Sequence, residues 1–214
     1  MVPSRSMPVT TDSLVLADFV EPLPGQRILD LGTGSGIIAL SLAARAEVTV
    51  VGIDNSFEAL EEAQQALERD RALLQGQVEF FPGDLRNLEY LAELGPFDQV
   101  VCNPPYFKLD EARLPPSEPR AAARHEISCT LEEVVRAAAQ VMPMQGVFSL
   151  VQIPARLGEV LQLLPAYGLA LQVIQPVYTA RDRDARLVLF RAMKGRNGTL
   201  RMLPPLHPRA LNGI

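Results

Sequence analysis

Cysteine is scarce in this sequence of 214 residues, which contains only Cys102 and Cys129. Two cysteines provide neither a disulfide framework nor the ligand spacing of a metal site, so we expect a reducing, cytoplasmic setting and no bound metal. Long apolar runs are also missing, because a stretch such as GVFSLVQIPA is too short to span a bilayer. The N-terminal residues lack the apolar segment of a signal peptide. These absences exclude membrane-spanning and disulfide-stabilised secreted proteins, and we expect no membrane partner.

The chain also has no overall excess of positive charge. Its net charge is −5, which argues against a protein that coats nucleic acids non-specifically. Residues 176–214, in contrast, carry a net positive charge, because they hold seven Arg and one Lys against two Asp. A basic C-terminal hairpin and tail on an acidic body suits a phosphate-rich partner. An edge hairpin whose cations are merely solvated fits the same charge pattern equally well.

Hydrophobic residues make up 48% of the chain, which excludes disorder, and the length suits a single domain spanning residues 1–214. Strand-like runs such as RILDLG and VTVVGID alternate with helical patterns, which predicts βαβ units. In SFEALEEAQQALERD we expect Ser56 to cap a helix and Phe57 to lie on its apolar stripe. The last two strands are joined by TARDRD, too short for a crossover helix, so they form an antiparallel hairpin. The pattern predicts an α/β fold: a doubly wound, Rossmann-like, mostly parallel seven-stranded sheet with a final antiparallel strand and helices on both faces.

A glycine-rich turn, DLGTGSG at residues 30–36, lies between the first predicted strand and helix. Glycines there let a ligand approach the backbone closely and expose amides at the helix N-terminus. The spacing differs from the dinucleotide fingerprint, and Asp30 would repel a pyrophosphate but suit a cationic ligand. Asp54 ends the second strand about 20 residues later, where it can accept two ribose hydroxyls. A purely structural tight turn is the alternative.

Asn103, Pro104, Pro105 and Tyr106 follow the fourth predicted strand. Proline has a fixed φ and no backbone donor, so this segment is a stiff loop that carries one amide and an aromatic ring. In a doubly wound sheet such a loop meets the glycine turn at the carboxyl edge of the strands, where ligands bind.

The motifs DLGTGSG, GIDNS, GDL and NPPY together resemble those of Rossmann-like S-adenosylmethionine-dependent methyltransferases. The resemblance implies S-adenosyl-L-methionine as cofactor and S-adenosyl-L-homocysteine as product, with Asp54 at the ribose and Asp84 at the adenine. Asp84 as a helix N-cap is the alternative. The cofactor-binding residues implied are Thr10, Thr11, Asp30, Gly32, Thr33, Gly34, Gly36, Asp54, Asn55, Asp84, Leu85 and Asn103. The catalytic residues implied are Asn103, Pro104, Pro105 and Tyr106.

An Asn-Pro-Pro-Tyr loop is typical of enzymes that methylate a planar nitrogen: N6 of adenine, N4 of cytosine or a glutamine amide. The stretches MPVTTDSLVLADFV and ARHEISCTLEEVV further resemble the small bacterial methyltransferases that modify N6 of adenine 37 in valine tRNA. Structured RNA, above all tRNA, is therefore the expected partner of a monomer or homodimer. A protein glutamine or other N-methyltransferase is the second hypothesis, and a non-catalytic RNA assembly factor that binds the cofactor is the third.

Several further residues and segments are candidates for substrate contact. His125 is expected to have a structural or substrate-orienting role, and Phe107 to be either a second stacking wall or a core anchor. Residues 1–9 are expected to be flexible, and residues 107–123 form either a lid or a passive surface loop. The predicted substrate-binding residues are Tyr106, Phe107, Arg124, His125, Arg181 and Arg183, with Arg186, Lys194, Arg196 and Arg201 as weaker candidates.

Overall fold

The computed structural model describes residues 11–104, 129–180, 183–195 and 198–207. The predictions for residues 1–9 and 107–123 fall outside these ranges, as do those for the residues Thr10, Pro105, Tyr106, Phe107, Arg124, His125, Arg181 and Arg196. The helices are α1 (Thr11–Phe19), α2 (Ile37–Arg45), α3 (Phe57–Asp70), α4 (Leu88–Leu94), α6 (Leu131–Val141) and α7 (Leu157–Ala166). The strands are β1 (Arg27–Leu31), β2 (Thr49–Asp54), β3 (Gln77–Pro82), β4 (Gln99–Cys102), β5 (Val147–Gln152), β6 (Leu169–Val177), β7 (Leu187–Lys194) and β8 (Arg201–Met202).

The described strands form one sheet in the order β3-β2-β1-β4-β5-β7-β6-β8. Strands β1 to β5 are mutually parallel, and β7 is antiparallel to both β5 and β6. The doubly wound α/β prediction is thereby confirmed, including the β6–β7 hairpin. A short strand that the sequence did not predict, β8, pairs in parallel with β6 at the sheet edge.

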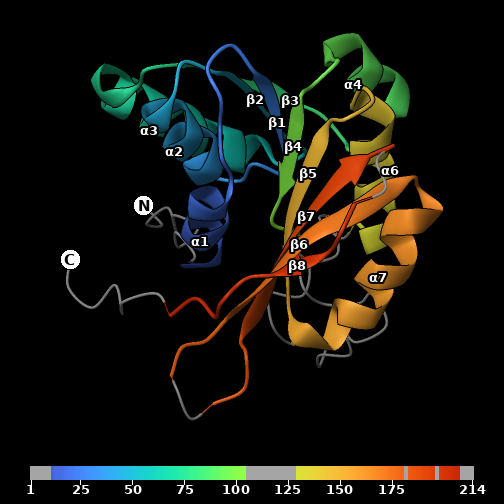
Figure 1. Cartoon of the computed structure of the whole chain (residues 1–214). Helices are drawn as coiled ribbons and strands as arrows, with labels where there is room; N and C mark the ends of the chain where they lie inside the picture. The colour runs from blue at the N-terminus through green and yellow to red at the C-terminus, as the bar shows by residue number, and fades with distance from the viewer. Residues whose placement is uncertain (1–10, 105–128, 181–182, 196–197, 208–214) are drawn as a thin grey trace, which may run out of the picture.

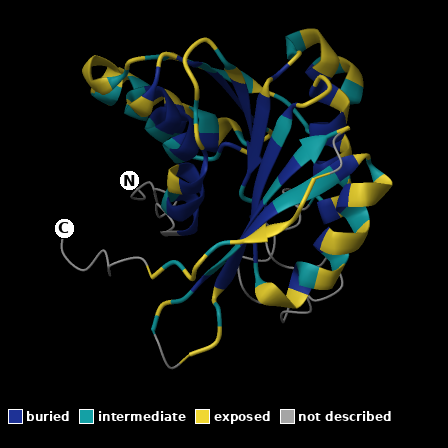
Figure 2. Cartoon of the chain, viewed as in Figure 1, coloured by how far each residue is buried: buried dark blue, intermediate teal, exposed yellow. Residues whose placement is uncertain are grey.

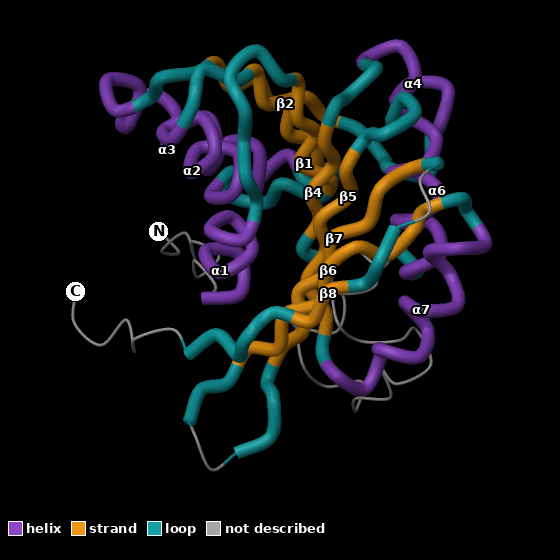
Figure 3. The backbone as a smooth tube through the Cα atoms, in the orientation of Figure 1, coloured by secondary structure: helices purple, strands orange, loops and turns teal. Residues whose placement is uncertain are grey.

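Two apolar cores cover the two faces of the sheet. Helices α1, α2 and α3 lie on one side of the strands and α4, α6 and α7 on the other, as the ribbon and the tube both show (Figures 1 and 3). Figure 2 shows the central strands buried between these layers. The Val- and Leu-rich strands pack on both sides, as parallel strands do. Because helices cover both faces of the sheet, a ligand can meet polar side chains of the strands only where the strands end, at the carboxyl edge.

Local signals explain where two helices begin. The Ser56 hydroxyl accepts from the Ala59 amide at 3.2 Å, so the predicted cap of α3 is confirmed. Helix α6 starts with a capping box, in which Thr130 and Glu133 each accept from the other's backbone amide. Phe57 was wrongly placed on the buried stripe: the residue is 74% exposed, whereas Ala59 and Ala63 of the same helix are buried.

Two cations of the basic C-terminal segment have structural roles. Lys194 Nζ donates to the backbone carbonyls of Ala139 and Met142, at 2.6 Å and 2.7 Å, and so caps the end of α6. These two bonds argue against the predicted RNA contact of Lys194, which stays a prediction. Arg191 pairs with Glu21 at 3.1 Å and lies over the Phe19 ring, which fastens β7 to the end of α1.

Candidate active site

The glycine-rich turn between β1 and α2 is tied to the end of β2. The amides of Gly32 and Thr33 both donate to the Ile53 carbonyl, at 3.0 Å and 2.9 Å. Gly32, Gly34 and Gly36 all have positive φ angles, of 70°, 54° and 77°. Residues that carry a side chain rarely adopt such angles. A Cβ on Gly36 would lie 2.6 Å from Phe80 Cζ, whereas one on Gly32 would meet no described atom within 4 Å. Gly36 is thus needed for packing, and the backbone of Gly32 is left uncovered by the residues that the structure describes.

Asp30 is the second-last residue of β1, just before this turn, and is completely buried. One carboxylate oxygen, Oδ2, accepts from the Thr33 hydroxyl at 2.7 Å. The other, Oδ1, is buried with no hydrogen-bond partner in the part of the chain that the structure describes. Burial raises the pKa of Asp30 from 3.8 to about 7. A cationic group of a ligand would suit this buried carboxyl. It would donate a hydrogen bond to Oδ1, and its positive charge would favour the ionised form of Asp30.

Asp54 ends β2 on the other side of the turn. Its Oδ2 accepts from the Gly34 amide at 2.8 Å, and its Oδ1 accepts from the Ser56 amide at 2.9 Å. These bonds hold the carboxylate at the mouth of the glycine turn, and each oxygen keeps a further lone pair. The arrangement is compatible with the predicted ribose contact, which stays a prediction.

Asp84 follows β3, and its carboxylate already accepts hydrogen bonds from Arg86. The Arg86 backbone amide and Nε both donate to Asp84 Oδ1, each at 2.9 Å. This hydrogen bonding lowers the pKa of Asp84 below its ordinary value. Helix α4 is capped by Asn87 instead, so the N-cap alternative for Asp84 is wrong. Leu85 is partly buried against the core under α4 and α6.

Asn103 and Pro104 follow β4 in the middle of the sheet. Cys102 is paired in register with Leu31, so Asn103 comes level with Gly32 at the same edge. The Asn103 Nδ2 donates to the Ser13 hydroxyl of α1 at 2.9 Å. This bond orients the side-chain amide with its nitrogen toward α1 and its oxygen turned the other way. Ser13 is a site residue that sequence reasoning missed, because no local signal relates it to a residue 90 positions later.

The neighbour of Ser13 joins the same site to the C-terminal hairpin. Asp12 is buried, and its Oδ1 lies 3.3 Å from Arg186 Nη2. Arg186 precedes β7, and its own amide donates to the Val177 carbonyl at 2.8 Å. Two consecutive residues of α1 therefore contact the loop after β4 and the β6–β7 hairpin. Arg183, predicted to bind substrate, is exposed within that hairpin.

The structure brings most of the described candidates together at one edge. Thr11 starts α1 there, Asp54 ends β2 and is followed by Asn55, and the glycine turn, Asp84 and Asn103 come after β1, β3 and β4. Cys102 and Cys129 are free thiols. No group of three or more His, Cys, Asp or Glu side chains within residues 11–104, 129–180, 183–195 and 198–207 is arranged to hold a metal ion. Among the helices described, none is long and apolar enough to cross a membrane.

Solved structures and a family comparison define the class of protein. Residues 28–117 match the family described as "Methyltransferase domain". A predicted O-methyltransferase from Agrobacterium tumefaciens is 26% identical, with a TM-score of 0.73 over 95% of this chain and 90% of that one. TrmN from Thermus thermophilus, 22% identical, has a TM-score of 0.59 over 85% of this chain and 48% of that one. The chain is an S-adenosylmethionine-dependent methyltransferase with a Rossmann-like fold.

Curated relatives narrow this class. The tRNA1(Val) (adenine(37)-N6)-methyltransferase of Shewanella loihica is 30% identical over 180 residues, which cover 83% of this chain and 72% of that protein. The protein of the same name from Bacteroides fragilis is 33% identical over 147 residues, 68% of this chain and 60% of that one. The chain belongs to the family of tRNA1(Val) (adenine(37)-N6)-methyltransferases.

Proposed function

We propose that this methyltransferase modifies N6 of an adenine in tRNA, at position 37 as in the names of its relatives. The observation that carries the proposal is the bond between Asn103 Nδ2 and Ser13 at the end of β4. It turns the Asn103 carbonyl oxygen into an oriented acceptor, level with the glycine turn at the carboxyl edge. An amine that is to be methylated there needs such an acceptor.

The chemistry follows from the electronic structure of the target. The lone pair of a planar amino nitrogen is delocalised into its ring, which makes the nitrogen a weak nucleophile. Two hydrogen bonds, from its N–H groups to Asn103 Oδ1 and to the Pro104 carbonyl, favour the pyramidal geometry of the transition state. Pro104 is buried and its φ is fixed, so these acceptors need little reorganisation. Tyr106 supplies a stacking face for a base that has been flipped out of its stack.

The residues around the glycine turn suit the cofactor. Its amino-acid end carries an ammonium group, which would pair with Asp30 Oδ1, an atom without a hydrogen-bond partner among the described residues. The ribose hydroxyls would donate to Asp54, and Leu85 would pack against the adenine ring. Asp84 would accept from the adenine amine while it also accepts from Arg86. S-adenosylmethionine supplies the methyl group as a sulfonium, so the protein has to align donor and acceptor in line.

Two observations favour tRNA over a protein glutamine as the substrate. The relatives that establish the family carry tRNA in their names. The β6–β7 hairpin, with Arg183 exposed, extends from the same edge as Asn103. Phosphates contacted by such arginines would make turnover sensitive to salt.

The proposal is tested by measuring which class of substrate receives a labelled methyl group. The protein is incubated with labelled S-adenosylmethionine and, separately, with unmodified total tRNA, with free adenine nucleotides and with a protein extract. We expect label in tRNA, recovered as N6-methyladenosine and lost with Asn103→Ala. Label found in protein alone would establish the glutamine hypothesis instead. Tight cofactor binding with no label in any substrate would leave the non-catalytic assembly factor.

A further inference from the structure

The end of the β6–β7 hairpin lies at the edge of the sheet that holds the candidate active site. Strand β6 is antiparallel to β7, and β7 is antiparallel to β5, so β6 runs in the same direction as β5. Its last residue, Val177, is thus at the carboxyl edge with Asn103. The described residues between β6 and β7, 178–180 and 183–186, extend past this edge, away from the body of the protein (Figure 1).

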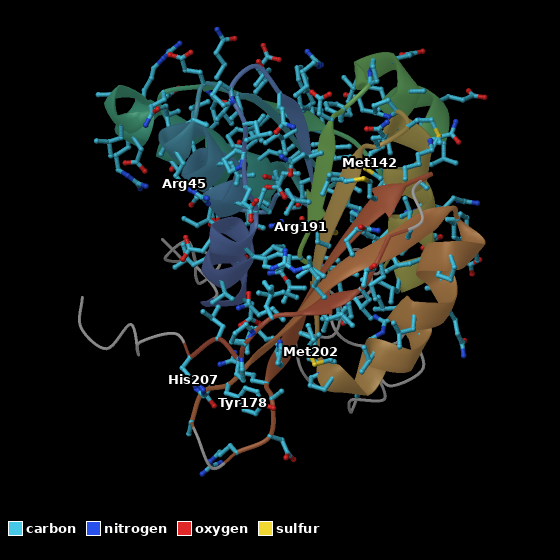
Figure 4. The ribbon with its side chains drawn as sticks, in the orientation of Figure 1. Arg45, Met142, Tyr178, Arg191, Met202 and His207 are labelled. Atoms are coloured by element: carbon cyan, nitrogen blue, oxygen red, sulfur yellow. The ribbon has the colours of Figure 1, made fainter. Side chains whose placement is uncertain are left out.

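The C-terminal segment is fastened along β6 and returns to this point. Strand β8 pairs with Val173 and Ile174, and the Leu206 amide donates to the Pro176 carbonyl at 2.9 Å. The Tyr178 amide in turn donates to the Leu206 carbonyl, also at 2.9 Å. These bonds place His207 beside Tyr178, with ring centroids 5.7 Å apart (Figure 4). The hairpin and the C-terminal segment therefore each contribute one aromatic ring to this point, and backbone pairing holds the two segments together.

Exposed cations accompany the two rings. Arg183 is exposed in the loop between Tyr178 and β7, and the Arg186 side chain is 53% exposed while it pairs with buried Asp12. Tyr178, Arg183, Arg186 and His207 form what we call the hairpin face. Arg191 and Lys194 do not belong to it, because both are committed to α1 and α6.

The hairpin face is joined to Asn103 through α1. Arg186 contacts Asp12, and the next residue, Ser13, holds the Asn103 amide. The Arg186 end of this face is therefore connected to Asn103 by two side-chain contacts on consecutive residues of α1. When a base is flipped into the active site, its neighbours in the strand lose their stacking partners. Aromatic rings with arginines beside them are the chemistry that binds such unpaired nucleotides.

We infer that the hairpin face binds the single-stranded nucleotides that flank the target adenine. This inference rests on the proposed function. The rings of Tyr178 and His207 stack on an unpaired base, and Arg183 and Arg186 contact backbone phosphates. The face contributes affinity for the RNA strand and leaves the cofactor site unchanged.

Binding of an unmodified valine tRNA transcript, measured in the presence of S-adenosylhomocysteine, tests the inference without requiring methyl transfer. We expect the double variant Tyr178→Ala with His207→Ala to bind the transcript about five- to a hundredfold more weakly. The conservative pair Tyr178→Phe with His207→Phe keeps both aromatic faces and should bind like the wild type. Arg183→Glu should weaken binding, while Arg71→Glu, an exposed arginine after α3, should not. Cofactor affinity and thermal unfolding, measured on every variant, should match the wild type.

Two results would overturn the inference. One is unchanged tRNA affinity in the double alanine variant and in Arg183→Glu. The other is an equal loss for the alanine and phenylalanine pairs, which would show that the ring faces are not what binds. Failure of the proposed function is a separate result: a wild-type protein that binds tRNA through this face but transfers no methyl to it. If a protein substrate rather than tRNA depended on these residues, the partner inferred would be wrong.

Discussion

The side-chain amide of Asn103, at the end of β4, donates to the hydroxyl of Ser13 near the start of α1 at a distance of 2.9 Å. Ser13 is itself buried, whereas Asn103 is half-buried. A helix outside the βαβ units thus fixes the orientation of the residue that we propose as hydrogen-bond acceptor for the substrate amine. Without this bond, the carboxamide could rotate and present its nitrogen to the amine.

Ser13→Ala should therefore lower kcat for methyl transfer, by about five- to thirtyfold, since one orienting hydrogen bond is lost. Affinity for S-adenosylmethionine and for tRNA should change little, and Ser13→Thr, which keeps the hydroxyl, should restore most of kcat. Ser41→Ala is a matched control, because the Ser41 hydroxyl bonds a carbonyl within α2. Equal losses of kcat in the Ser13 and Ser41 variants would show a general effect on stability instead.

Asp30 should make stability depend on pH in a direction unusual for a carboxylate. Burial raises its pKa from 3.8 to about 7, so the folded chain keeps a proton that the unfolded chain releases. The free energy of unfolding should therefore fall as pH rises between these values, by about 4 kcal/mol in total. Asp30→Asn is neutral throughout and should lack this contribution. Urea unfolding across the range checks the difference, and parallel curves for the two proteins would contradict it.

Asp54→Ala should weaken cofactor binding by about ten- to a hundredfold, because two backbone donors lose their acceptor, as does the ribose in the contact that we propose. Titration calorimetry with S-adenosylmethionine measures the change. Asp98→Ala is the matched control, since Asp98 accepts from the Arg27 amide at the opposite end of β1. A similar loss of cofactor affinity in both variants would argue against a direct role for Asp54.

Lys194→Met should destabilise the protein by about 1–3 kcal/mol, because the last carbonyls of α6 lose a charged donor. The change is measured by urea denaturation. Arg201→Met, at an exposed position on β8, should change the free energy of unfolding by less than about 0.5 kcal/mol. Tighter or weaker tRNA binding in Lys194→Met without a change in stability would restore the original RNA-contact hypothesis.

Local patterns were sufficient to predict the parts of the fold that depend on nearby residues. The alternation of strands and helices, the Ser56 cap and the β6–β7 hairpin each depend on a short stretch of sequence. The positions of the glycine turn, Asp54, Asp84 and Asn103 followed from the geometry of parallel sheets, in which such strand ends share one edge.

Features that depend on distant residues could not be predicted in this way. The Ser13–Asn103 bond exists because α1 packs beside the edge of the sheet, which no spacing in the sequence reveals. Charge alone did not distinguish Lys194, which caps α6, from Arg183, which is exposed. The pairing of β8 with β6 involves two residues and carries no strand pattern.

The most direct test of the central claim uses two valine tRNA transcripts that differ only at position 37, adenine in one and guanine in the other. Single-turnover methyl transfer to each is followed with the wild-type protein and with Asn103→Ala. The account predicts N6-methyladenosine in the adenine transcript alone, formed at least about a hundredfold more slowly by the variant. Equal methylation of both transcripts, or an undiminished rate in Asn103→Ala, would contradict it.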